Sequence, residues 1–271
     1  MLHAGKFSFS FERPLIMGIV NITPDSFSDG GKFFTTTVAI EHACRLMEQG
    51  ADILDIGGES TRPGADDVSV TEELHRVIPA IEALVSKGFP VSIDTQKTEV
   101  MREALAAGAC MINDVNALQS DGAIDVVVAS QAAICLMHRQ GAAKVMQLNP
   151  HYDDVVAEVK AFLLARADVA MTAGIQRSRI VLDPGFGFGK TQYHNIALVK
   201  SLPAFTALEF PVLAGLSRKR LLGELTGRPP EERGAASIAA AIIAVQKGAA
   251  IVRVHDVMAT RDALTIAEAL R

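Results

Sequence analysis

The sequence contains no tryptophan and few other aromatic residues. Aromatic side chains make up 5% of the 271 residues, whereas 49% are hydrophobic, mostly alanine, valine, isoleucine and leucine. Such a composition suits helices interleaved with buried strands better than an antiparallel sandwich. The sequence therefore favours the α/β class.

Cysteine and clustered positive charge are scarce as well. The three cysteines, Cys44, Cys110 and Cys135, lie far apart and lack the spacing of metal ligands, which indicates reduced thiols in a cytoplasmic protein. The net charge is -5, and no long block of basic residues occurs. These features argue against a protein that binds nucleic acid.

Long hydrophobic runs and linkers are missing too. The apolar segment 14–20 is too short to cross a membrane, and residues 1–12 lack the hydrophobic stretch of a secretion signal. No stretch rich in proline, glycine and serine divides the chain. Because 271 residues match the size of one closed α/β barrel, we expect a single domain over residues 1–271.

What is present is a repeated pattern of a glycine, a short apolar run, and then a polar or charged residue. A glycine suits the end of a helix, and about five aliphatic residues suit a strand that is buried on both faces. The pattern follows Gly50, Gly88, Gly108, Gly174 and Gly248. Around a parallel sheet, such units gather their polar residues at one end, where α/β proteins build their sites.

Eight candidate strands follow from the apolar runs, with helical periodicity between them. They lie near 15–20, 52–56, 90–94, 111–113, 133–137, 180–183, 211–214 and 250–254. Eight strands with connections long enough for crossovers predict a (β/α)8 TIM barrel. An open doubly wound sheet is the competing fold.

Two of the predicted helices carry further signals. Segment 70–86 follows Ser69 and has Glu72 three residues later, which matches a capping box, and Pro79 within it suggests a bend. Segment 234–246 is apolar on nearly every side. Because the outer helices of a barrel normally face water, we predict a homodimer that covers this surface.

The polar loop after the first strand allows two interpretations. Its Pro-Asp and Asp-Gly-Gly sequences favour turns by themselves. Asn21 and Asp29 also offer hard oxygen ligands to Mg2+ beside a phosphate. The residues alone leave both interpretations open.

The glycine-rich segment 183–191 ends like a Walker A loop. It has Pro184 where that motif requires glycine, which argues against nucleotide binding. Its glycines allow tight turns that would direct Phe186 and Phe188 into the mouth of a site. The alternative is that both phenylalanines belong to the core.

Seven motifs in succession resemble those of the dihydropteroate synthase family, in that family's order. They are NITPDSFSDGG (21–31), DIGGESTRPG (55–64), SIDT (92–95), ND (113–114), DPGFGFGK (183–190), SRK (217–219) and RVH (253–255). The resemblance implies a (β/α)8 fold and a dimer. It also implies the condensation of 6-hydroxymethyl-7,8-dihydropterin diphosphate with 4-aminobenzoate, which releases pyrophosphate in folate synthesis.

The resemblance assigns one group of residues to the pterin. A carboxylate accepts adjacent N–H donors well, and Asp183 would do so at the pterin edge. Asn113 would match the mixed donor and acceptor atoms nearby, and Asp94 would contact the other edge of the ring. Lys219 would reach the pterin carbonyl and ring nitrogen. Met137, Val115 and Gly215 would complete this site. Without the resemblance, helix N-capping would explain Asp94 and Asp183 equally well.

A second group would hold the departing diphosphate. By resemblance it consists of Asn21, Thr61, Arg253 and His255, with Mg2+ bound by Asn21 and Asp29. Cations at this end oppose the negative charge that develops on the leaving group. Asp29 and Ser28 belong to the catalytic loop, and the family implies an SN1-like path without a covalent nucleophile.

A third group would bind 4-aminobenzoate. Ser217 precedes a predicted helix at 218–225, so its hydroxyl and the helix N-terminus would both receive the carboxylate. The resemblance adds Arg62, Pro63, Phe27, Phe188 and Lys219. The expected partners are these two small-molecule substrates and a second copy of the chain. Neither a nucleic acid nor a membrane is expected.

Three alternatives compete with this function. A methyltetrahydrofolate-corrinoid methyltransferase has a similar barrel but needs neither a diphosphate clamp nor an aminobenzoate site. A Schiff-base aldolase would carry a lysine at the end of the sixth strand, where this chain has Asp183. A non-catalytic pterin-binding relative would have lost some of the charged strand ends, and none is missing here.

Overall fold

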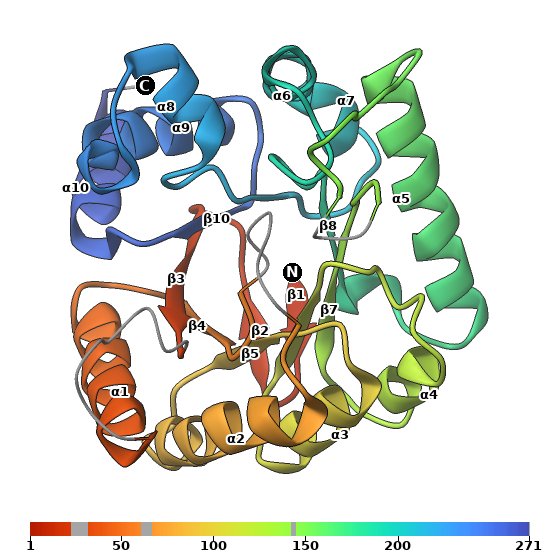
Figure 1. Ribbon diagram of the computed structural model, residues 1–271, viewed down its shortest axis with the longest axis vertical. Helices are drawn as coiled ribbons and strands as arrows, with labels where there is room; N and C mark the ends of the chain where they lie inside the picture. The colour runs from red at the N-terminus through yellow and green to blue at the C-terminus, as the bar shows by residue number, and fades with distance from the viewer. Residues whose placement is uncertain (23–31, 61–66, 142–144, 271) are drawn as a thin grey trace.

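The computed structural model describes residues 1–22, 32–60, 67–141 and 145–270, and Figure 1 shows helices arranged around a central set of strands. Within these residues, eight parallel strands follow one another in the order β8-β7-β6-β5-β4-β3-β10-β9. They are β3 (Leu15–Asn21), β4 (Ile53–Gly57), β5 (Val91–Asp94), β6 (Met111–Asp114), β7 (Ala133–Met137), β8 (Ile180–Asp183), β9 (Leu213–Ala214) and β10 (Ile251–Val254). A parallel bridge between Leu182 and Val212 joins the two ends of this order. The predicted (β/α)8 barrel is confirmed, and the open doubly wound sheet is wrong.

Helices connect the strands and surround the barrel (Figure 1). They are α1 (Lys32–Glu48), α2 (Val70–Ser86), α3 (Thr98–Ala106), α4 (Ala123–Val128), α5 (Val155–Thr172), α6 (Gln192–Lys200), α7 (Leu202–Thr206), α8 (Arg220–Thr226), α9 (Gly234–Gln246) and α10 (Val257–Ala269). Ser69 caps α2 by accepting a hydrogen bond from the Glu72 N–H at 3.2 Å, as predicted. The helix continues through Pro79 to Ser86.

The five glycines of the repeated pattern end helices as the sequence predicts. Each follows a helix and has a φ angle between 82° and 105°, a left-handed conformation that glycine adopts without steric penalty. At Gly108 the space is closed as well, because a Cβ there would lie 2.6 Å from the Val85 side chain. These caps turn the chain from the outer helices into the strands.

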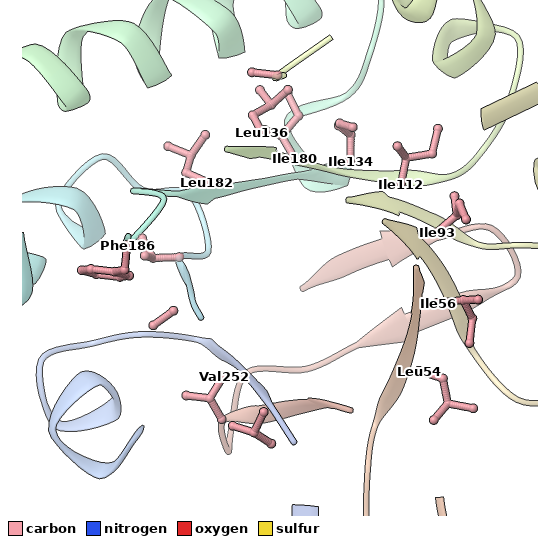
Figure 2. Packing of buried hydrophobic residues seen from close by; sticks show 14 of the residues in the cluster. Leu54, Ile56, Ile93, Ile112, Ile134, Leu136, Ile180, Leu182, Phe186 and Val252 are labelled. Atoms are coloured by element: carbon pink, nitrogen blue, oxygen red, sulfur yellow. The ribbon is translucent and has the colours of Figure 1, made fainter. Parts of the chain in front are cut away.

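Alternation along each strand divides its side chains between two cores. Ile112, Ile134 and Leu182 belong to the larger cluster between barrel and helices, and Figure 2 shows side chains of this cluster beside the strands. Met111 and Cys135, at neighbouring positions of the same strands, belong to a second cluster inside the barrel. A period of two therefore points every second residue to the barrel axis. Polar residues at those positions face one another across the barrel.

A short hairpin closes the amino end of the barrel. Strands β1 (Leu2–Ala4) and β2 (Phe7–Phe9) pair antiparallel, and Leu2 and Ala4 are fully buried in the inner cluster. The Gly5 N–H donates to the Gln131 carbonyl at 2.8 Å, which ties the turn to the barrel. The sequence did not predict this hairpin, because strands of three residues carry too little periodicity.

Leu2→Ala is expected to lower the free energy of unfolding by about 2–5 kcal/mol, because it opens a cavity where a leucine side chain is fully enclosed. Urea denaturation followed by circular dichroism measures the change. His3→Ala is the matched control: its neighbouring side chain is exposed and contacts Ser8 across the hairpin. Equal midpoints for Leu2→Ala and the unmodified chain would show that the hairpin does not seal the barrel.

Helix α9 is apolar on both its inner and its outer side. Ser237, Ala241 and Ala244 are buried, whereas Ala235 and Ile243 are exposed. The homodimer predicted from this helix stays a prediction. Among the described residues, no helix has the length and apolar character needed to cross a membrane.

Candidate active site

Inward-facing polar residues meet at the carboxyl end of the barrel. Asp94 is the last residue of β5 and lies beside Asn113 of β6, while Asp183 ends β8 beside Met137 of β7. Asp94, Asn113 and Asp183 are almost completely buried. Three hydrogen-bonding groups predicted for the pterin therefore share one end of the barrel.

Arg253 joins two carboxylates across this end. Its Nε donates to Asp55 Oδ2 at 2.6 Å, and its Nη2 donates to Asp94 Oδ2 at 2.7 Å. Asn113 Nδ2 donates to the same Asp55 oxygen at 3.0 Å. In the part of the chain that the structure describes, Asp55 Oδ1 and Asp94 Oδ1 are buried without a hydrogen-bond partner. Such oxygens are ready acceptors for a ligand that carries N–H groups.

Asp55 begins one of the seven motifs but received no role from the sequence, and the structure places it among the candidate site residues. It lies in the middle of β4, fully buried, between Leu54 and Ile56, which both face the helices. A single charge within an apolar strand was the available signal, because a carboxylate is buried only when another group compensates its charge. The partner, Arg253, is too distant in sequence for spacing to reveal it.

Burial and the neighbouring cations act on Asp94 in opposite directions. Burial raises the pKa of Asp94 to about 7, and Arg253 opposes that rise while Asp55 adds to it. Burial also raises the pKa of Asp183 above its usual value, against a hydrogen bond from the Gly185 N–H. Each carboxylate would be favoured in its ionised form by additional positive charge at the site.

The glycine-rich loop after β8 wraps around Asp183. Asp183 Oδ1 accepts the Gly185 N–H at 2.7 Å. Gly185 has a φ of 69°, and a Cβ at this position would collide with the His138 carbonyl. A side chain here would push the loop away from β7, so glycine is required for the close approach.

Lys190 binds the same loop through hydrogen bonds from its buried ammonium. Its Nζ is 2.9 Å from His138 Nδ1 and donates to the carbonyls of Gly185 at 2.9 Å and Phe188 at 3.0 Å. Burial lowers the pKa of Lys190 to about 7, against the attraction of Asp183. Burial, with Lys190 beside it, lowers the pKa of His138 to about 3, so the imidazole is neutral. This lysine orders backbone carbonyls of the loop.

Lys219 and the two phenylalanines of the loop have different surroundings. The Lys219 ammonium lies over the Phe188 ring, 4.0 Å from its centroid, and both residues are half-buried. Burial lowers the pKa of Lys219 to about 8, and Arg253 acts in the same direction. Phe186 is 2% exposed and belongs to the outer hydrophobic core. The expectation that Phe186 faces the mouth of the site is therefore wrong, whereas Phe188 lies beside a predicted substrate-binding lysine.

Ser217 and His255 lie together at the ends of β9 and β10. Ser217 Oγ is 2.9 Å from His255 Nδ1 and also accepts the His255 N–H at 3.3 Å. Helix α8 begins at Arg220 instead of the predicted 218, because Arg218 has a left-handed φ of 57°. Ser217 thus stands before a turn, and its hydroxyl links the predicted aminobenzoate and diphosphate groups.

Asn21 fits one half of the predicted metal site. It ends β3 next to Gly57, and a Cβ on Gly57 would lie 3.6 Å from Asn21 Oδ1 and 3.9 Å from Asp94 Oδ2. The missing side chain leaves space between two hard oxygen donors. The described residues contain no cluster of three or more His, Cys, Asp or Glu able to hold a metal, and the second predicted ligand, Asp29, lies outside them.

The other predicted residues are placed as follows. Val115 follows β6 and is buried, Met137 ends β7 and is buried, and Gly215 follows β9 and is half-buried. The remaining predicted residues, Phe27, Ser28, Asp29, Thr61, Arg62 and Pro63, lie outside the described residues.

A buried charge cluster that the sequence did not reveal flanks segment 61–66. Lys97 Nζ donates to Glu73 Oε2 at 2.5 Å and lies 3.0 Å from Glu59 Oε1. Glu59 Oε1 also accepts the Val68 N–H at 2.7 Å. These bonds connect residues on both sides of the segment to α2 and to Lys97 at the start of α3.

Comparison with known proteins identifies the family. Residues 17–255 match the family model described as Pterin binding enzyme. A dihydropteroate synthase of Neisseria meningitidis serogroup C is 53% identical over 272 residues, covering 98% of this chain and 96% of that protein. The chain belongs to the dihydropteroate synthase family.

Solved structures agree in fold and in overall length. Xanthomonas albilineans dihydropteroate synthase with 4-aminobenzoic acid is 56% identical, with a TM-score of 0.92, and the match covers 97% of this chain and 94% of that one. The same organism's enzyme in complex with 7,8-dihydropteroate is 53% identical, with a TM-score of 0.88, over 97% and 95% of the chains. The resemblance found in the seven motifs is therefore confirmed.

Membership of the dihydropteroate synthase family makes this chain a transferase. The aldolase, corrinoid methyltransferase and non-catalytic alternatives are set aside. Arg62, residues 217–219 and residues 253–255 argued against the corrinoid methyltransferase, and Asp183 argued against the aldolase. Of these residues, Asp183, Lys219 and Arg253 lie close together at the same end of the barrel.

Proposed function

We propose that this enzyme condenses 6-hydroxymethyl-7,8-dihydropterin diphosphate with 4-aminobenzoate to give 7,8-dihydropteroate and pyrophosphate. The observation that carries the proposal is the arrangement around Arg253, where buried carboxylates and an amide lie beside three cations or potential cations, Arg253, Lys219 and His255. Such a site accepts an N–H-rich ring at one side and an anionic group at the other.

The pterin would bind against Asp94, Asn113 and Asp183. Asn113 donates its amide N–H to Asp55, which directs the amide oxygen toward a different partner. Asp183 Oδ1 is held by Gly185, so Oδ2 is the natural acceptor for the pterin N–H groups. Lys219 would donate to the pterin carbonyl, and Met137, Val115 and Gly215 would line the ring.

Cleavage would separate charge along the substrate. The electron pair of the methylene carbon–oxygen bond leaves with pyrophosphate, and positive charge spreads over the pterin beside Asp94 and Asp183. Arg253 uses Nε and Nη2 for carboxylates, and its five N–H donors leave others for the diphosphate. His255 would assist at the same end. Groups of opposite sign placed before reaction lower the barrier, which favours an SN1-like path.

The amine of 4-aminobenzoate would then attack the methylene carbon. The new nitrogen–carbon bond replaces the broken carbon–oxygen bond, and the nitrogen releases one proton. Ser217 would receive the aminobenzoate carboxylate, while Phe188 with Lys219 above it would flank the benzene ring. Arg62, Pro63 and Phe27 are proposed for the same substrate.

Mg2+ is part of the proposal. Asn21 would hold the ion together with Asp29 and diphosphate oxygens, and Thr61 and Ser28 are proposed beside them. When bound, the ion would neutralise charge on the leaving group. The fit rests on the oxygen donors that Gly57 leaves uncovered. We also propose a cytoplasmic homodimer that buries the outer face of α9.

The test is a pyrophosphate-release assay with each substrate alone and with both together. Rapid release is expected only with both substrates and Mg2+, and excess EDTA should reduce the rate strongly. Product identity is checked by mass spectrometry, which distinguishes dihydropteroate from hydrolysed pterin. Full turnover in EDTA would rule out the metal proposal, and absence of dihydropteroate would overturn the proposed reaction.

A further inference from the structure

The segment after β6 contains two adjacent residues in a conformation that their side chains disfavour. Ala117 has a φ of 51° and Leu118 a φ of 56°. Among the described residues, these are the only neighbouring non-glycine residues with positive φ. A left-handed backbone brings Cβ close to the following carbonyl, so other contacts must hold both residues in place.

One set of those contacts comes from the end of β6 itself. Asp114 Oδ1 accepts the Asn116 N–H at 2.7 Å, and Asp114 Oδ2 accepts the Leu118 N–H at 2.7 Å. The Asp114 carbonyl accepts the Ala117 N–H at 3.1 Å. Asp114 is fully buried, so its carboxylate is committed to this turn.

The second set comes from a distant helix. Arg166 of α5 donates from Nε to the Ala117 carbonyl at 2.8 Å and from Nη2 to the Leu118 carbonyl at 2.9 Å. The planar guanidinium makes both donations from a rigid fork, whereas a lysine would have to make them from a single ammonium on a flexible stem. Arg166 therefore donates hydrogen bonds to the carbonyls of both left-handed residues, and Asp114 accepts hydrogen bonds from N–H groups of the same turn.

The turn adjoins residues proposed to bind the pterin. Asn113 immediately precedes Asp114, and its carbonyl accepts the Thr95 N–H at 3.2 Å. Val115 lies between Asp114 and the strained pair and is buried. A relaxation of Ala117 and Leu118 toward common backbone angles would rotate the chain at Val115 and pull on the end of β6.

We propose that Arg166 is a positioning residue for pterin recognition, which keeps the β6 end in its binding geometry by holding the strained turn. The inference rests on the proposed function, since it concerns the pterin site formed by Asn113 and Val115. Arg166 touches neither substrate in this proposal. Its effect should appear in pterin affinity more than in aminobenzoate use.

Arg179 provides a matched control. It donates from Nε to the Ala132 carbonyl at 2.8 Å and from Nη2 to the Val127 carbonyl at 2.9 Å. Arg179 therefore makes the same two kinds of bond, but directly before β8, at the amino end of the barrel. Removing Arg179 should lower stability and leave the pterin site intact.

The experiment measures binding of 6-hydroxymethylpterin by calorimetry and the Michaelis constant for the aminobenzoate substrate by pyrophosphate release. Arg166→Ala should weaken pterin binding about tenfold. Without Arg166, Ala117 and Leu118 can relax to common backbone angles, and the end of β6 then leaves its binding geometry. The Michaelis constant for aminobenzoate should stay near its original value. Arg179→Ala should lower the melting temperature with pterin affinity unchanged.

Rescue separates positioning from general damage. Ala117→Gly in the Arg166→Ala background should restore part of the pterin affinity, because glycine adopts positive φ without strain. Arg166→Lys keeps the charge but loses the rigid fork of donors, and should give an intermediate affinity. Unchanged pterin binding in both Arg166 variants, or equal losses in the Arg166 and Arg179 variants, would overturn the inference. Failure of the unmodified enzyme to bind the pterin would instead overturn the proposed function.

Discussion

Replacing Arg253 with methionine should lower both stability and activity strongly. Arg253 is the cation that joins Asp55 and Asp94, with side-chain exposures of 18%, 0% and 10% respectively. Removing one partner from a buried ion pair leaves uncompensated charge, which reduces the free energy of unfolding by about 3–5 kcal/mol. Loss of a preorganised cation beside the leaving group should reduce kcat on the order of 10²- to 10³-fold. Urea denaturation and steady-state kinetics measure the two effects.

Two controls separate charge burial from catalysis. Arg218→Met removes an arginine whose partner, Asp256, is also at the mouth, but this pair is about one-third exposed and should contribute about 0–1 kcal/mol. The double variant Asp55→Asn with Arg253→Met should regain part of the stability and remain slow. An Arg253→Met enzyme with unchanged stability would contradict the assigned ion-pair network.

The stability loss of Arg253→Met should depend on pH. In the folded protein the pKa of Asp94 is about 7, which is above its value in the unfolded chain. Arg253 lowers this pKa, so removing Arg253 should raise it further. A folded-state pKa that is raised makes the folded protein bind a proton more tightly, and stability then falls as pH rises toward that pKa. The difference from the unmodified chain should therefore be smaller at about pH 5 than at about pH 8. An equal difference at both values would argue that Asp94 does not respond to Arg253.

Asp183→Asn is expected to weaken pterin binding by about 2–4 kcal/mol, because it replaces an acceptor with a donor facing pterin N–H groups. The Gly185 N–H should retain the amide oxygen, which turns the amide nitrogen toward the ligand. Calorimetry with 6-hydroxymethylpterin measures the loss. Stability should be kept or increased, because burial already disfavours the charged form of Asp183 in the folded protein.

The combination of weak binding and retained stability is what identifies Asp183 as a ligand. Asp256→Asn serves as the control, since it removes a carboxylate that pairs with Arg218 at the same end of the barrel. That variant should keep its pterin affinity. If Asp183→Asn bound the pterin as tightly as the unmodified enzyme, Asp183 would be a loop-capping residue only.

Much of the barrel could be predicted because its determinants are local. All eight apolar runs became strands, and the glycines before them adopt the left-handed conformation expected of helix caps. The errors follow from geometry as well: the helix predicted at 218 starts at Arg220, where an unforeseen left-handed Arg218 delays it. Phe186 packs into the outer core, and no spacing rule distinguishes it from Phe188, two residues later.

The candidate site was predictable as a set of residue types and much less as a set of contacts. The motifs named Asp94, Asn113, Asp183, Lys219 and Arg253. They did not show that Asp55 lies among them, nor that Ser217 contacts His255. Those pairs join residues far apart in the chain, and only closure of the barrel brings them within hydrogen-bonding distance.

Neighbouring residues in the chain were enough to predict the family, the strand positions and the chemical character of the strand ends, because periodicity, glycine caps and motifs are local properties. The folded barrel was needed to show which charges compensate one another, which backbone groups Lys190 and Arg166 hold, and how a three-residue hairpin strand closes the amino end of the barrel. Buried charges and strained turns depend on partners that arrive from other elements. The costs of burying these charges and straining these turns, and the contacts that offset the costs, therefore arise only when the barrel closes.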